Sequence, residues 1–427
     1  MAASEANPPG EPSLKAPLVS AVTSPFWRFG VDLWAILIAV SIPWSTSAVG
    51  VFSVIWLLAL IPTINRREML DTLRRPACWL PIALVVLAVV GTVWADGPWR
   101  ERLLAILPAL KLLAIPLLML HFARSARGNW VFIAFLVSCT ILMALSWVVL
   151  WDPGWKISNT ELAGVPLKNA ISQNQEFALC AFGLAYSAWA LWRQDRRPIA
   201  TAAVLLMLAF IANILFAALA RTALVYLLAL SVLFVALHFG RRMTIWLVPI
   251  GAVAIAAVWF ISPHLRERVE HIAVELREYK ETNRPTSAGQ RLAFWQMSLK
   301  WIAEAPVAGH GTGSAKRLFV EEAAGKEGAW SQTISNPHNQ TLYVAIQWGA
   351  LGCVLLYAMW FHHILLFRGS GLVNWIGLMV VVQNVFSSLL NSHLFDFHEG
   401  WIYVLGVGVA GGMVLRSSAI DAPGRSN

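Results

Sequence analysis

Apolar runs of about 20 residues recur from end to end of the chain, and they limit its possible folds more than any other feature. An α-helix rises 1.5 Å per residue, so about 20 residues are needed to cross the roughly 30 Å hydrocarbon core of a bilayer. The sequence therefore predicts an all-α polytopic membrane protein with about 12 transmembrane helices. The expected spans lie near residues 28–46, 48–64, 78–95, 103–121, 130–150, 175–192, 199–218, 221–239, 244–262, 341–367, 372–390 and 400–415.

The composition leads to the same conclusion. Of the 427 residues, 58% are apolar and 13% are charged, whereas about a quarter of the residues of a soluble domain are charged. The excess apolar surface needs lipid as its solvent, and the 22 Trp suit the headgroup level, where Trp collects. The net charge of +9 does not indicate nucleic-acid binding, because no basic soluble module interleaved with aromatic residues accompanies it.

The basic residues are distributed unevenly between the two sides of these spans. With the N-terminus in the cytoplasm, the short segments on the far side hold five of them, Arg100, Arg102, Lys156, Lys168 and Arg221. The cytoplasmic segments hold 16, namely Lys15, Arg28, Arg66, Arg67, Arg74, Arg75, Arg124, Arg127, Arg193, Arg196, Arg197, Arg241, Arg242, Arg368, Arg416 and Arg425. Cytoplasmic loops are enriched in Lys and Arg, so this bias predicts that both termini are cytoplasmic.

The spans divide the chain into five regions. We expect a cytoplasmic disordered tail at 1–26, helices 1–9 at 27–262, one large loop domain on the far side at 263–340, helices 10–12 at 341–416, and a cytoplasmic tail at 417–427. Within the large loop, 264–282 and 289–304 carry apolar residues at helical spacing, whereas 305–337 is rich in Gly, Ala, Ser and Pro. Two helices followed by loops and short helices are predicted there.

The stretch that leads into the tenth span carries the most informative candidate, His338. Asn336 can cap a helix that begins at Pro337, which places His338 in the first helical turn at the far membrane surface. The positive end of a helix keeps an imidazole neutral, so His338 could act as a general base, and the free N–H groups would attract an anion. The alternative is an interfacial histidine that makes an ordinary hydrogen bond.

Small residues along the same helix suggest which way His338 faces. Ala345, Gly349 and Gly352 are expected on its face, since 11 residues from His338 to Gly349 are close to three whole turns. Small residues at this spacing let another helix approach closely. We therefore predict that His338 faces the helix bundle and not lipid.

Three arginines are candidates for binding an anion. Arg221 opens the eighth span without an acidic neighbour in the sequence, although arginines at span boundaries are often only interfacial anchors. Arg266 belongs to a basic set in the large loop that alternates with glutamates, which is typical of a solvated, salt-bridged helix face. Arg291 has no acidic residue within several positions, and Arg is a natural phosphate ligand because its fork binds two oxygens.

Polar residues in two other external segments are weaker candidates. The last external loop contains His393, Asp396, His398 and Glu399, where a metal site is conceivable but Asp396 as the orienting partner of a histidine is favoured. Lys168, Gln173, Asn174 and Gln175 could bind a sugar or phosphate, or be ordinary loop polarity. Lys111 lies within an apolar run, where a charge is costly unless residues 100–113 lie along the interface.

These features together resemble the bacterial O-antigen ligase family, whose superfamily includes O-antigen polymerases and protein O-oligosaccharyltransferases. His338 and Asn339, followed after nine residues by Gly349-Ala350-Leu351-Gly352, fit the family's pattern of His, then Asn, Ser or Gln, nine residues and GxxG. The Gly289-Gln290-Arg291 helix start and the glycine-rich run 308–313 resemble the superfamily's signature region. Twelve spans with one large periplasmic loop before the tenth match the family's architecture.

The resemblance implies a reaction and a set of roles. The family transfers O-antigen polysaccharide from undecaprenyl pyrophosphate to lipid A–core oligosaccharide at the periplasmic face of the bacterial inner membrane, as a metal-independent, inverting glycosyltransferase. His338 would then be the general base, and Asp396 the family's late periplasmic acid. Arg221 and Arg291, with Arg266 as a further candidate, would bind the pyrophosphate. Lys168, Asn174, Asn339 and Gln340 would be weaker substrate contacts, with membrane lipids as surroundings and no cofactor, nucleotide or nucleic acid.

Three alternatives remain open at this point. A polymerase or a protein O-oligosaccharyltransferase would use the same lipid-linked donor and the same residues. A lipid-linked glycan transporter should show buried charges or interrupted helices near the midplane, and Lys111 is the only such charge that the sequence suggests. A structural scaffold predicts that substitution of His338 alone changes nothing measurable.

Overall fold

The computed structural model of the protein describes residues 24–420, except residue 161 and most of 247–262. All regular elements in this part of the chain are helices, as the apolar runs predicted. Most of the expected ninth span at 244–262, most of the tail expected at 1–26 and the end of the tail expected at 417–427 lie outside the described residues.

The helices fall into three groups along the chain. The first group is α2 (Pro25–Ser41), α3 (Thr46–Leu60), α4 (Arg66–Leu73), α5 (Pro76–Val90), α6 (Trp99–Leu104), α7 (Leu107–Leu110), α8 (Ala114–Phe122), α9 (Gly128–Trp151), α10 (Ala170–Arg193), α11 (Arg197–Phe216) and α12 (Arg221–His238). The second is α14 (Pro263–Thr282), α15 (Ser287–Glu304) and α16 (Ser314–Ala323). The third is α17 (Gln340–Leu366), α18 (Leu372–Ser387) and α19 (Phe397–Ile420).

Seven helical segments of the described chain are long and apolar enough to cross a membrane, or eight if the pair α4–α5, bent by 86°, forms one broken span. The seven are Thr46–Thr63, Trp99–Phe122, Gly128–Trp151, Arg197–Phe216, Arg221–His238, Gln340–Leu366 and Phe397–Ile420. Helices α2, α5 and α18 have only 17, 15 and 16 residues, and the first turns of α10 are polar. The number of twelve therefore stays a prediction.

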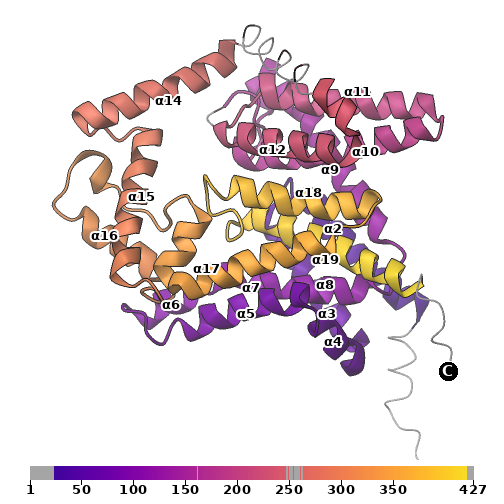
Figure 1. Ribbon diagram of the computed structural model, residues 1–427, viewed down its shortest axis with the longest axis horizontal. Coiled ribbons are helices and arrows are strands. Elements are labelled where there is room, and N and C mark those ends of the chain that lie inside the picture. Colours follow the sequence, from indigo (N-terminus) through magenta and orange to yellow (C-terminus); the bar gives the residue numbers. More distant parts are fainter. Residues whose placement is uncertain are drawn as a thin grey trace, which may run out of the picture.

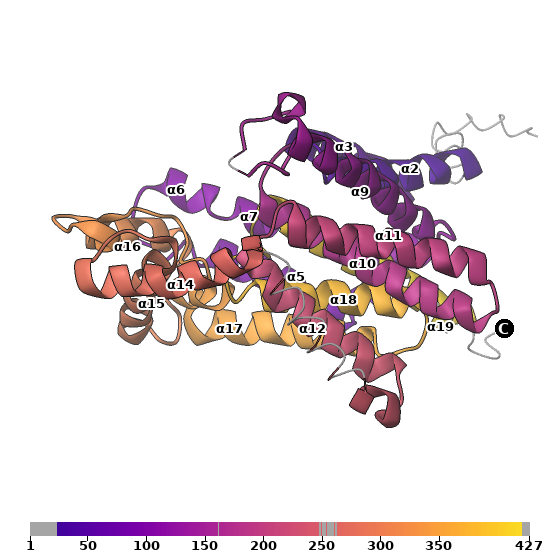
Figure 2. The same ribbon diagram turned by 90° about the horizontal axis from the view of Figure 1, so that it is seen from above.

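The second group of helices lies at one end of the molecule. Figure 1 shows α14, α15 and α16 together at the left, whereas α4 and the end of α19 lie toward the right, and Figure 2 likewise separates α14, α15 and α16 from α19. The predicted helices at 264–282 and 289–304 are confirmed as α14 and α15. A small core that includes Phe294, Trp301, Phe319 and Ile346 joins α15 and α16 to the head of α17.

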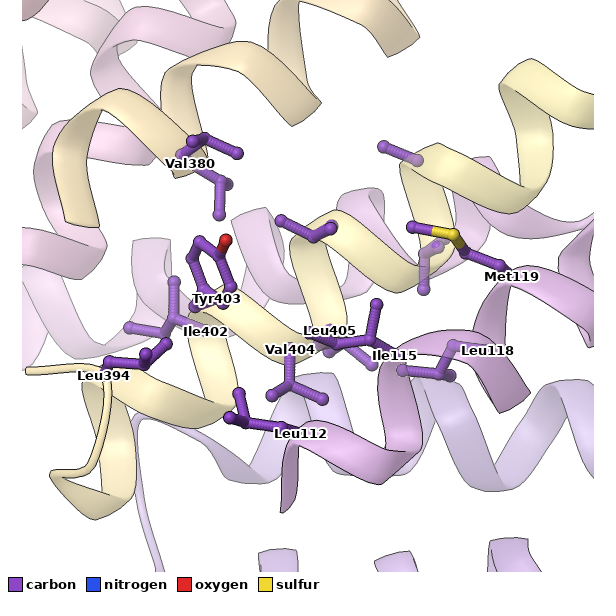
Figure 3. Packing of buried hydrophobic residues seen from close by; sticks show 14 of the residues in the cluster. Leu112, Ile115, Leu118, Met119, Val380, Leu394, Ile402, Tyr403, Val404 and Leu405 are labelled. Atoms are coloured by element: carbon purple, nitrogen blue, oxygen red, sulfur yellow. The ribbon is translucent and has the colours of Figure 1, made fainter. Parts of the chain in front are cut away.

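The main core forms where α19 packs against α8 and α18. Figure 3 shows Leu112, Ile115, Leu118 and Met119 beside Ile402, Tyr403, Val404 and Leu405 of α19, with Val380 of α18 nearby. Glycines in α19 permit this approach: a Cβ added to Gly408 would lie 2.6 Å from the Leu118 Cβ, and one added to Gly412 would lie 2.7 Å from the Met119 carbonyl oxygen. Small residues at helix contacts serve this purpose in membranes.

Helix α17 is interrupted at Gly349, which has φ 56° and ψ −149°. A Cβ at this position would collide with the carbonyl of Val307, so the contact requires glycine. The glycine-rich segment 306–311 enters the break and replaces the missing helical hydrogen bonds. Four main-chain bonds join the two: His310 N to Ile346 O at 2.8 Å, Gly311 N to Gln347 O at 2.8 Å, Ala350 N to Pro306 O at 2.8 Å and Leu351 N to Val307 O at 3.2 Å.

This interruption corrects the expected helical face. Gly349 approaches the backbone of a loop and not another helix, and the helix that follows His338 begins only at Gln340. The two residues therefore do not share one continuous helix over three turns. The same break and the separation of α6, α7 and α8 are interrupted helices that the sequence did not indicate.

Candidate active site at the head of α17

His338 stands just before α17 and not in its first turn. Asn339 is the N-cap, because its side chain accepts a hydrogen bond from the Leu342 amide at 3.0 Å. The prediction that Asn336 caps this helix is wrong: its Oδ1 accepts from the amide of His338 itself at 2.9 Å. This tight turn holds His338 at φ 52°, a left-handed conformation that is uncommon for a residue with a side chain.

The imidazole of His338 has one polar partner in the described chain. Its Nδ1 lies 2.9 Å from the Oδ1 of Asn391, in the loop between α18 and α19. An amide oxygen only accepts, so Nδ1 donates and carries the proton, which leaves the lone pair on Nε2. Burial lowers the pKa of His338, and the positive charge of Arg291 lowers it further, against the opposing effect of the Asn391 hydrogen bond. The ring is therefore neutral at pH 7.

Arg291 lies in the first turns of α15, which Thr286 caps by accepting a hydrogen bond from the Gly289 amide. No hydrogen bond or ion pair within the described residues engages its guanidinium, in keeping with the absence of acidic neighbours in the sequence. Burial lowers the pKa of Arg291, as does the charge of Arg221, while Glu275 opposes both. An arginine stays protonated under such shifts, so Arg291 presents a positive charge beside His338 without a direct ion-pair partner among the described residues.

Arg221, at the start of α12, has an acidic partner that sequence reasoning missed. Its two terminal nitrogens donate to the two carboxylate oxygens of Glu275 at 2.9 and 2.7 Å, across 54 residues of sequence. The side chains are 19% and 17% exposed. The Arg221 hydrogen bonds lower the pKa of Glu275, although burial opposes them. No local pattern could have identified Glu275 among the glutamates of α14, because the pair forms only in the fold.

The backbone that leads into Arg221 is held by a residue expected to contact substrate. The Nδ2 of Asn174 donates to the carbonyl of Ala218 at 2.8 Å, and the Asn174 side chain is fully buried. Gln175, its neighbour in α10, hydrogen-bonds the ring of His393 at 3.0 Å. Asn174 thus holds the backbone just before Arg221, and a substrate contact by Asn174 stays a prediction.

Asn339 and Gln340 are also engaged with protein. Asn339 donates through Nδ2 to the carbonyl of Leu389 at 3.0 Å, and the Oε1 of Gln340 accepts from the amide of Leu394 at 3.0 Å. Both bonds fix the loop that carries Asn391. The arrangement couples the position of Asn391 directly to the cap of α17.

Asp396 does not orient His338 in this structure, since the ring of His338 is held by Asn391. The backbone carbonyls of Phe395 and Asp396 receive the ammonium of Lys111, which accounts for a charge that the sequence left unexplained. Burial raises the pKa of the Asp396 carboxyl to about 7, and the nearby Glu399 adds to this. A role for Asp396 in catalysis stays a prediction.

Two other candidate cations are engaged elsewhere. Arg266, near the start of α14, donates to the carbonyl of Phe260 at 3.0 Å. It stands nine residues before Glu275, or about 13 Å along the helix axis, so the structure does not bring it into the cluster of His338, Arg291 and Arg221. The ammonium of Lys168 binds the carbonyl of Ile42.

The structure also contains buried charges that the sequence did not reveal. Glu399 in α19 accepts a hydrogen bond from Ser172 at 2.6 Å, and Glu176 of α10 is 1% exposed. Asp32 of α2 is paired with both His121 and Arg127. Besides Lys111, the described chain thus holds several buried ionisable side chains. Among the described residues, no three Asp, Glu, His or Cys side chains form a group that could hold a metal ion.

Comparison with known proteins adds one match. Residues 206–357 match the family described as O-antigen ligase, and this confirms the resemblance seen in the sequence over that stretch. No curated protein matches the chain. The matched stretch contains Arg221, Glu275, Arg291 and His338, whereas Asn391 lies beyond it.

Proposed function

We propose, on the premise that residues 206–357 belong to the O-antigen ligase family, that the protein is an O-antigen ligase. It transfers O-antigen polysaccharide from undecaprenyl pyrophosphate to a hydroxyl of lipid A–core oligosaccharide, with inversion at the anomeric carbon. The observation that carries the proposal is that the neutral imidazole of His338 lies near Arg291, whose guanidinium has no hydrogen bond or ion pair within the described residues. One side chain supplies a base and the other a site for the leaving group.

His338 is the general base in this proposal. The acceptor hydroxyl gives its proton to Nε2 of His338 while its oxygen attacks the anomeric carbon of the donor sugar. Asn391 holds the proton on Nδ1, so that the lone pair stays on the opposite side of the ring. General base catalysis of this kind contributes about 10²- to 10⁴-fold to the rate.

Arg291 and Arg221 bind the pyrophosphate. As the new glycosidic bond forms, the bond between the anomeric carbon and the pyrophosphate oxygen breaks, and the electron pair leaves with the pyrophosphate. Arginine charges already in place stabilise that developing negative charge without reorganisation. A lipid pyrophosphate is a good leaving group, so no general acid, metal or nucleotide enters the scheme. Asp396, whose carboxyl pKa is raised by burial to about 7, acts on the acceptor side in this proposal.

The site belongs at the periplasmic face of the inner membrane in this proposal. The basic helix α4 and the end of α19 lie at the opposite end of the molecule from α14, α15 and α16 (Figure 1). In this proposal both termini are cytoplasmic and His338 lies on the periplasmic side, and the separation of α4 and the end of α19 from α14, α15 and α16 supports it. The lipid tails of donor and acceptor would then remain in the bilayer during transfer.

Two observations favour a second candidate, a transporter of lipid-linked glycan. The interruption of α17 at Gly349 and the buried carboxylates Glu176 and Glu399 are features that transporters use. A transporter would move the lipid-linked glycan without forming a glycosidic bond. A polymerase or a protein O-oligosaccharyltransferase would form the bond with another acceptor.

The deciding experiment is ligation in vitro with purified protein, undecaprenyl pyrophosphate-linked glycan and lipid A–core, with and without chelator. Wild type should form the conjugate in both conditions, and His338→Ala should be inactive though folded. His271→Ala, an exposed histidine of α14, is the matched control and should keep full activity. Extension of the lipid-linked glycan in place of conjugate would indicate a polymerase, and activity in His338→Ala would remove the proposed base.

A further inference from the structure

The two terminal nitrogens of the Arg221 guanidinium already bind a carboxylate. Glu275 places one oxygen on each terminal nitrogen of Arg221, at 2.9 and 2.7 Å. This two-point geometry is the one in which a guanidinium binds two oxygens of a phosphate. In the protein without substrate, Glu275 therefore occupies the position that a phosphate group would take on Arg221.

Glu275 has a second donor that is also suited to an anion. Its Oε2 accepts a hydrogen bond from the main-chain N–H of Ala288 at 2.9 Å, in the first turn of α15. Helix N-termini attract anions because their first N–H groups have no helical acceptor. Arg291 follows three residues later, and in the part of the chain that the structure describes its guanidinium has no hydrogen bond. Withdrawal of one carboxylate thus exposes the fork of Arg221 and the Ala288 N–H beside Arg291.

The pair is accessible enough to be exchanged. The side chains of Arg221 and Glu275 retain 19% and 17% of their exposure, so a solute can reach them. The Nε of Arg221 is buried without a partner, which leaves its guanidinium incompletely satisfied by Glu275 alone. An anion with more charge and more oxygens than a carboxylate can satisfy these donors better.

We propose that Glu275 is a specificity-determining residue: its carboxylate occupies the phosphate position on Arg221 and the Ala288 N–H, and the incoming pyrophosphate displaces it. This inference rests on the proposed function, since it takes Arg221 and Arg291 as the pyrophosphate site. An anion that cannot bind Arg291 and replace the Glu275 carboxylate at the same time is excluded from the site. A diphosphate, with two groups to place, meets that requirement.

The test uses inorganic pyrophosphate as the probe and measures its dissociation constant by calorimetry with the full-length protein in detergent. Glu275→Gln removes the competing charge but keeps the size of the side chain, so it should bind pyrophosphate about tenfold more tightly than wild type. Glu278→Gln is the matched control, because it removes the same charge from α14 at a residue whose ion pair in the described chain is with Arg284 and not with Arg221. Its affinity should equal that of wild type.

Arg291→Gln separates this inference from the proposed function. If it loses pyrophosphate binding while Glu275→Gln gains affinity, both stand. If it loses binding while Glu275→Gln is unchanged or weaker, the pyrophosphate site stands and the displacement of Glu275 is wrong. If wild type and Glu275→Gln both fail to bind pyrophosphate, both ideas are wrong.

Glu275→Asp provides a second variant in case Glu275→Gln does not fold. It keeps the charge but shortens the side chain by one methylene, which prevents the two-point contact. Its affinity for pyrophosphate should lie between those of wild type and Glu275→Gln. An affinity equal to or below that of wild type would contradict the displacement.

Discussion

The Nδ1 atom of His338 and the Oδ1 atom of Asn391 lie 2.9 Å apart, although 53 residues separate them in the chain. His338 precedes α17, and Asn391 lies in the loop between α18 and α19. The bond selects one tautomer of the imidazole and sets the direction in which the free nitrogen points. The base of the proposed reaction is thus oriented by an uncharged residue, so the ring gains no proton affinity from a neighbouring carboxylate.

Asn391→Ala should lower kcat for ligation by about 10- to 100-fold, the usual effect of removing a partner that orients a catalytic histidine. KM should change little, because Asn391 is not expected to contact substrate. Initial rates over a range of acceptor concentrations separate the two parameters. A change confined to KM would mean that Asn391 binds substrate and does not position the base.

Activity should rise with pH through a limb whose midpoint lies below 6.5, the ordinary pKa of histidine, and should be constant above neutrality. Burial lowers the pKa of His338, and only the neutral ring can accept a proton. The pH dependence of kcat/KM measures this limb for the free enzyme. Asn391→Asp places a negative charge beside Nδ1 of His338, which should raise the pKa of the ring and move the midpoint upward. An unchanged midpoint would contradict the assignment of this limb to His338.

Arg221→Ala should destabilise the protein, because it leaves the carboxylate of Glu275 partly buried without its partner. Adding Glu275→Ala should recover part of the loss, giving a coupling free energy of about 1–2 kcal/mol. Since the pKa of Glu275 is lowered from 4.5, the stabilisation is present above pH 4.5 and is lost as pH falls through the lowered value. Unfolding of the two single variants and the double variant at pH 7 measures the coupling, and strict additivity would contradict it.

Gly349→Ala should cost at least about 2 kcal/mol of stability, because the residue has φ 56° and its Cβ would collide with Val307. Gly50→Ala in α3 is the matched control, since nothing lies within 4 Å of its added Cβ. It should be neutral or slightly stabilising. Thermal unfolding in detergent compares the two, and equal melting temperatures would contradict the structure of the break.

The helical elements followed from the sequence because apolar runs and their spacing are local properties. The helices on either side of Asn283 in the large loop were predicted within a few residues for this reason. The break in α17 was not predicted, because Gly349 and Gly352 fit a close contact between two helices equally well. The two possibilities, a helix contact and a break, differ only in whether residues 306–311 bind to α17, and the local sequence does not show this.

The basic residues of the site could be predicted from the sequence, but the residues that bind them could not. Arg291 stood out because its neighbours in sequence are uncharged, and in the structure no hydrogen bond engages it within the described residues. Glu275 and Asn391 could not be assigned, since each meets its partner across more than 50 residues. Asp396 was favoured as the orienting residue because acids commonly fill that position, whereas the fold delivers an amide.

The hydrogen bonds between residues 306–311 and the broken part of α17 also determine which parts of the outer segment can move. They join the middle of this segment, residues 263–340, to α17 through four main-chain hydrogen bonds, the same kind of bond that joins adjacent turns of one helix. Residues 306–311 and the head of α17 are therefore expected to move as one unit. In the proposed reaction, the base His338 would thus stand beside a part of the protein that keeps its shape while the substrates enter.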